Sequence, residues 1–113
     1  MDYDSAQPII LNYGQLVDDD DRNFLNRLRQ GVPPIPGQVT EILLALKVLF
    51  EALKEVPALE RDLVSALFTL AYDSRQSFTA GRQRGVEWPP LLDEDLERIA
   101  IAVRSILAGT WYG

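Results

Sequence analysis

Three arginines and a tryptophan follow one another closely and are the residues best suited to binding an anion. They are Arg75, Arg82, Arg84 and Trp88, and no acidic residue occurs in residues 74–86. Guanidinium groups bind carboxylates and phosphates through paired hydrogen bonds, and a tryptophan adds a large contact surface. We therefore expect these four residues to bind an anion or an acidic protein segment. The alternative is a solvated loop in which Trp88 folds onto the neighbouring helices.

Catalytic chemistry is limited by the composition. The chain contains no Cys and no His, which excludes thiol nucleophiles, disulfides and histidine-dependent triads within it and disfavours a zinc site. An enzyme would have to use carboxylates, with or without a hard cation. The candidate carboxylates are Glu41, Glu51, Glu60, Asp62, Asp73, Asp93, Asp95 and Glu97. Because they fall mostly on predicted exposed faces, we expect surface charges and no catalytic residue, metal or cofactor.

Four consecutive aspartates, Asp18 to Asp21, allow two interpretations. Acidic residues directly before a short predicted helix, residues 22–30, suit its N-cap and first turn. Carboxylates also bind Ca²⁺ or Mg²⁺, but this run lacks the alternation and the turn glycine of a calcium loop. We therefore expect helix capping rather than a metal site.

The negative charge of the chain is concentrated near its N-terminus. The net charge is −6, residues 1–21 contain six Asp and no Lys or Arg, and the remainder carries 11 acidic and 11 basic residues. Pro8, Asn12 and Gly14 disfavour a helix in residues 1–17. The expected organisation is an extended acidic arm, residues 1–17, followed by a single α-helical domain, residues 18–113. An acidic chain also disfavours nucleic-acid binding.

Two amphipathic helices within residues 38–83 are expected to organise the fold. Apolar residues recur at helical spacing on both sides of Pro57. Pro57 suits the first turn of the second helix, and a short connection makes the two helices antiparallel neighbours. With the helices predicted at residues 22–30 and 92–108, the fold class is all-α. We expect a small bundle of about four helices around this central antiparallel αα-hairpin.

Apolar residues on otherwise polar surfaces mark a possible contact between chains. Leu44 and Val48 lie one helical turn apart among charged residues, and Ile101 lies on the polar side of the last predicted helix. Trp111 and Tyr112 form an aromatic tail that we expect to dock, either on this chain or on another, because large aromatic side chains gain most when buried. We predict all five as interface residues, and the stripe of Leu44 and Val48 suits a helix–helix contact, most simply that of a twofold homodimer.

The function best matching these features is a non-enzymatic protein-interaction module: an adaptor, regulator or assembly factor that binds another protein. In one version of it, the acidic segment folds onto the loop that carries Arg82, Arg84 and Trp88, called here the Arg-rich loop, and is displaced by a partner. The alternative is a ligand-binding or enzyme-accessory domain that holds an anionic small molecule at the Arg-rich loop. The start of the chain resembles no signal peptide, and the uncharged stretch within residues 63–72 is too short to span a bilayer. We expect a cytoplasmic protein without membrane contact.

Overall fold

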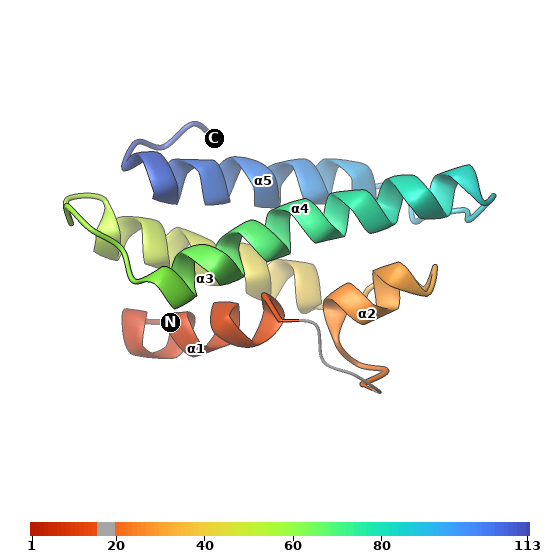
Figure 1. Ribbon diagram of the computed structural model, residues 1–113, viewed down its shortest axis with the longest axis horizontal. Helices are drawn as coiled ribbons and strands as arrows, with labels where there is room; N and C mark the ends of the chain where they lie inside the picture. The colour runs from red at the N-terminus through yellow and green to blue at the C-terminus, as the bar shows by residue number, and fades with distance from the viewer. Residues whose placement is uncertain (16–19) are drawn as a thin grey trace.

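The computed structural model describes residues 1–15 and 20–113, which form helices and loops but no strand (Figure 1). The helices of this described part are α1 (Tyr3–Tyr13), α2 (Phe24–Arg29), α3 (Gln38–Leu53), α4 (Arg61–Gln83) and α5 (Leu92–Ala108). The all-α prediction is confirmed. The number of helices differs from the expected four because one helix forms where an extended arm was predicted.

Helix α1 is that additional helix, and it corrects the prediction of an extended arm over residues 1–17. Asp2 caps it by accepting a hydrogen bond from the Ser5 amide at 2.9 Å, which lowers the pKa of the Asp2 carboxyl. Ala6 and Ile10, one turn apart, are fully buried, and α1 packs on both α3 and α4. Capping and burial together outweigh the cost of Pro8 inside the helix. The last two residues of the predicted arm lie outside the described residues.

Helix α2 begins with an asparagine cap, so the predicted aspartate cap is wrong. Asn23 Oδ1 accepts a hydrogen bond from the Asn26 amide at 2.9 Å. Asp20 instead accepts a bond from the Arg22 amide at 2.9 Å in the turn before the helix. The cap belongs to Asn23 because this residue has extended backbone angles immediately before Phe24. Asp18 and Asp19 lie outside the described residues.

Helices α3 and α4 are consecutive, yet they are not each other's main packing partners. Each packs instead on both α1 and α5, and α2 packs on α4 (Figure 1). Pro57 lies in the connection rather than in the first turn of α4, which begins only at Arg61. The seven-residue connection, 54–60, allows the two apolar faces to meet α1 and α5. The predicted central hairpin is therefore replaced by a core that α1, α3, α4 and α5 share.

Every helix contributes fully buried residues to one contiguous core. Ile10, Phe24, Leu46, Leu67 and Ile99 represent the five helices in it, and all are less than 2 % exposed. Each such side chain stabilises the fold by about 1.5–3 kcal/mol when removed from water. Over the residues that the structure describes, no helix has the length and apolar content needed to cross a membrane. The packing leaves the outer side of α4 and its junction with α5 facing solvent.

Candidate functional site

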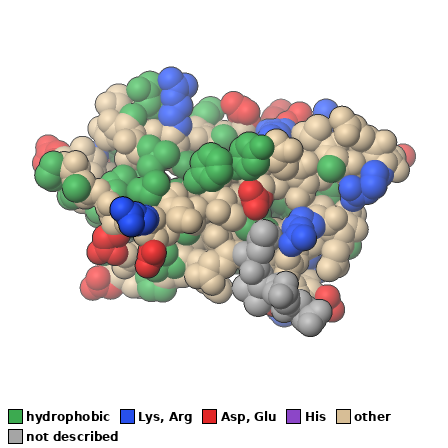
Figure 2. Space-filling view, in the orientation of Figure 1, with side chains coloured by type: hydrophobic (Ala, Val, Ile, Leu, Met, Phe, Trp, Pro, Cys, Tyr) green, Lys and Arg blue, Asp and Glu red, His purple; other side chains and the backbone are tan. Residues whose placement is uncertain are grey.

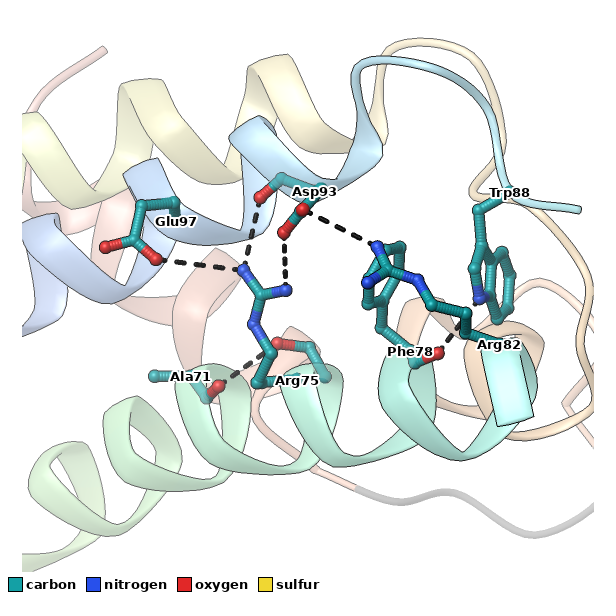
Figure 3. A network of polar contacts seen from close by, with 8 residues as sticks. Ala71, Arg75, Phe78, Arg82, Trp88, Asp93 and Glu97 are labelled. Carbon is teal, nitrogen blue, oxygen red and sulfur yellow. Dashed lines mark hydrogen bonds and ion pairs between the residues drawn. The ribbon is translucent and has the colours of Figure 1, made fainter.

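Arg75 and Arg82, two of the four predicted anion-binding residues, bind carboxylates of their own chain (Figure 3). Arg75 Nη1 lies 2.6 Å from Asp93 Oδ1, and Arg75 Nη2 donates to the Asp93 carbonyl oxygen at 3.2 Å. The same Nη2 lies 3.8 Å from a Glu97 carboxylate oxygen. Arg82 Nη2 lies 3.5 Å from the other oxygen of Asp93. This cluster fastens the C-terminal half of α4 to the first turns of α5.

Trp88 folds back onto α4, as the alternative interpretation of the loop predicted. Its Nε1 donates a hydrogen bond to the Phe78 carbonyl oxygen at 3.0 Å, and its ring stacks on Phe78 with 5.7 Å between centroids. Gly81 makes room for the ring, because a Cβ there would lie 2.6 Å from a Trp88 carbon. The guanidinium carbon of Arg82 lies over the Phe78 ring, 4.5 Å from its centroid. Arg84 is exposed at the C-cap of α4 and does not join the carboxylate cluster.

The Arg75–Asp93 pair makes stability depend on pH. The hydrogen bond from Arg75 is the main cause that lowers the pKa of Asp93, and the charges of Arg75 and Arg82 add to it. A carboxyl whose pKa is lower in the folded chain stabilises the fold above its unfolded-state pKa, about 3.9. This contribution is lost as the pH falls through the lowered folded-state value.

We expect Asp93→Asn to reduce the free energy of unfolding slightly at pH 7, because the exposed pair is screened by water. The difference from the unmodified chain should narrow as the pH falls below about 4. Urea unfolding, followed by circular dichroism at pH 7 and again below about pH 4, measures this difference in the free energy of unfolding. Glu94→Gln is the matched control, since Glu94 also lies in the first turn of α5 but only pairs with Arg98 at 3.8 Å. If the two chains differed as much in free energy of unfolding at low pH as at pH 7, the effect would not come from the charge of Asp93.

The predicted interface residues of α3 and α5 differ in how far they are buried. Leu44 is 56 % exposed, whereas Val48 is half-buried and packs against the core. Ile101 is half-buried on α5. The stripe expected from Leu44 and Val48 is therefore narrower than the sequence indicates, and its role in an interface remains a prediction.

Trp111 and Tyr112 dock on their own chain. The Trp111 ring meets Phe50 edge-on at 5.1 Å between centroids, and Lys47 Nζ lies 3.9 Å from the Trp111 centroid. The Tyr112 amide donates to Ser105 Oγ at 2.9 Å. Both rings remain partly exposed, at 37 % and 49 %. The aromatic tail thus covers the C-terminal ends of α3 and α5, and its contact with another chain remains a prediction.

The candidate carboxylates are spread over the surface. Glu51 pairs with Lys47 at 3.4 Å and Lys54 at 2.9 Å, and Asp95 pairs with Arg98 at 2.9 Å. Within the described residues, no three acidic side chains gather closely enough to hold a metal ion. Glu41 borders a hollow beside α1 and accepts a hydrogen bond from Tyr13. Burial of Tyr13, together with that bond, raises the pKa of its phenol to about 12.

An exposed aromatic pair on α4 is the feature that sequence reasoning missed. Phe68 and Tyr72 stack with 5.2 Å between centroids and 12° between ring planes, and they are 57 % and 50 % exposed. Figure 2 shows apolar side chains gathered over the middle of α4. Phe68 lies one helical turn after Val64, so in the sequence it resembles a core residue of its helix. Its i, i+4 spacing from Tyr72 was the signal available in the sequence.

A groove between α4 and α5 adjoins the aromatic pair. The groove is lined by the smaller side chains of Ala71, Ala100 and Val103 and by the larger side chains of Phe68, Tyr72, Arg75, Gln76, Glu97 and Leu107. Leu107 is 46 % exposed. We call this groove and the aromatic pair the α4–α5 face. Its lining can bind an apolar side chain but holds no nucleophile or paired carboxylates for catalysis.

The chain matches no protein-family model, and neither a curated protein nor a solved structure is significantly similar to it.

Proposed function

We propose that the chain is a non-enzymatic protein-interaction module, an adaptor, regulator or assembly factor, that contacts its partner through the α4–α5 face. One observation supports this most directly. Of the four phenylalanines, Phe24, Phe50 and Phe78 are buried and only Phe68 is exposed, stacked on the exposed Tyr72. Aromatic side chains gain free energy when a partner removes them from water, and they are enriched at interfaces.

The surroundings of the aromatic pair also favour protein contact. Small side chains, Ala71 and Ala100, lie beside it in the groove, where they leave room for a partner side chain. Arg75 and Glu97 border the groove with opposite charges 3.8 Å apart. A central apolar patch with a polar border is the usual arrangement of a protein interface.

The alternative function, holding a small anion at the Arg-rich loop, has weaker support. An incoming anion would have to displace Asp93 from both Arg75 and Arg82. It would also have to overcome the repulsion of the released carboxylate. Arg84 is the one predicted anion-binding arginine outside the cluster in the described part of the chain, and a single exposed arginine binds an anion weakly.

The test is photo-crosslinking in native cell extract with a photoreactive residue in place of Gln76, which is exposed beside Tyr72. We expect protein adducts that decrease at least about tenfold when Phe68→Ala and Tyr72→Ala are combined, as for truncated hot-spot residues. The control places the photoreactive residue at Glu94, on an exposed position of α5 outside the groove. Adducts at Gln76 that are unaffected by the two substitutions would contradict the proposed function.

A further inference from the structure

The α4–α5 face carries a protrusion and a hollow side by side. Phe68 and Tyr72 protrude, being at least half exposed, and the groove beside them has a volume of about 410 Å³. A surface that has both features can bind a copy of itself, since each copy inserts its protrusion into the hollow of the other. This is the shape expected of a twofold self-contact.

The charge of the face also suits a second copy. The exposed residues of α4 between Leu63 and Gly81 are uncharged: they are Ser65, Phe68, Tyr72, Gln76, Thr79 and Ala80. Two copies that each carry a net charge of −6 repel one another. Contact through an uncharged stripe of α4 brings fewer like charges together than contact through a charged face would. The groove is bordered by Arg75 and Glu97, whose opposite charges pair with each other, so the face has no excess charge to attract a strongly acidic or basic partner.

The size of the face indicates a contact of modest strength. The uncharged stripe from Ser65 to Thr79 is about 21 Å long at 1.5 Å per residue, and two packed helices are about 20 Å wide. The resulting flat area, roughly 400 Å² per copy, is about half that of a standard interface. Such an area suits a dimer whose population depends on protein concentration in the micromolar range.

We propose that a second copy of this chain covers the α4–α5 face. The two α4 helices run antiparallel, and a twofold axis passes between the aromatic pair and the groove, so that Phe68 and Tyr72 of one copy lie in the groove of the other. The proposal rests on the proposed function, because it names the partner of the same face. It differs from the dimer expected from the sequence, which used Leu44, Val48 and Ile101.

The experiment is sedimentation velocity of the full chain from about 1 µM to about 500 µM, the range in which weak dimers dissociate. We expect a monomer–dimer equilibrium whose dissociation constant rises at least tenfold in the variant Phe68→Glu, Tyr72→Glu. Leu44→Glu is the matched control, since it adds a charge at a site that is 56 % exposed, and it should leave the equilibrium unchanged. Added salt should strengthen the dimer, because it screens the repulsion between acidic copies.

Two results would overturn this proposal. A chain that remains monomeric over the whole range has no self-contact of this kind. A dimer that survives the α4 variant but dissociates in Leu44→Glu uses the α3 stripe instead. Either result leaves the proposed function standing if adducts at Gln76 still depend on Phe68 and Tyr72, so the two failures are distinguishable. Circular dichroism confirms that each variant is folded.

Discussion

Replacing Phe24 with alanine is expected to lower the free energy of unfolding by about 3–5 kcal/mol. Phe24 is the first residue of α2 and is fully buried. Its ring meets that of Tyr13 at an interplanar angle of 87° and a centroid distance of 6.3 Å, so it joins α2 to the end of α1. The alanine variant leaves a cavity where these two helices meet. Urea unfolding followed by far-UV circular dichroism measures the loss.

The same substitution at Phe68 is the matched comparison. Phe68 is 57 % exposed, and its truncation mainly removes the stacking contact with Tyr72. We expect a cost below about 1.5 kcal/mol, the range of such aromatic pairs. If Phe68→Ala were as destabilising as Phe24→Ala, Phe68 would be a structural residue. The proposed interaction surface would then lose its main support. A small cost would instead mean that folding does not require an aromatic side chain at this position.

Helix periodicity and flanking glycines predict α3 and α5 well because those signals are local. The helix expected at residues 92–108 forms as α5 with the same bounds, and Gly109 ends it with a left-handed backbone at φ 73°. Helix α3 likewise begins at Gln38 after Gly37, whose φ is 93°. In both cases the residues that stop or start the helix stand next to it in the sequence.

The arginine cluster and the aromatic pair required knowledge of which helices are neighbours. Arg75 stands out in the sequence, but its partner Asp93 lies 18 residues further on. The two meet only because α4 packs against α5. Phe68 fits an apolar helical face equally well whether a neighbouring helix covers it or not. Its exposure follows from the placement of α4 on α1, α2 and α5, which local patterns do not determine.

The N-terminal helix shows how tertiary packing overrides local preference. Pro8, Asn12 and Gly14 each disfavour a helix over residues 1–17 when considered alone. Gly14 nevertheless has a packing role, because it is buried where the end of α1 approaches α4. A residue that looks like a helix breaker in the sequence is here the one that permits close contact between two helices.

Gly14→Ala is therefore expected to be strongly destabilising, by about 1–3 kcal/mol or more. A Cβ at Gly14 would lie 2.6 Å from Ala66 Cβ and would also collide with the Ala66 carbonyl oxygen on α4. The backbone of Gly14, at φ −82° and ψ 21°, is one that alanine adopts without strain. The loss would thus report the collision between α1 and α4. Thermal and urea unfolding measure it, with Asn12→Ala, at an exposed position of α1, as the control.

Adding Ala66→Gly to this variant tests the cause of the loss. The second substitution removes the Ala66 Cβ but leaves the carbonyl oxygen in place, so we expect only partial recovery. It also introduces a glycine into α4, which costs about 1 kcal/mol by itself. If Gly14→Ala were neutral, α1 would not approach α4 closely. The N-terminal segment would then be better described as the extended arm that its proline, asparagine and glycine predict.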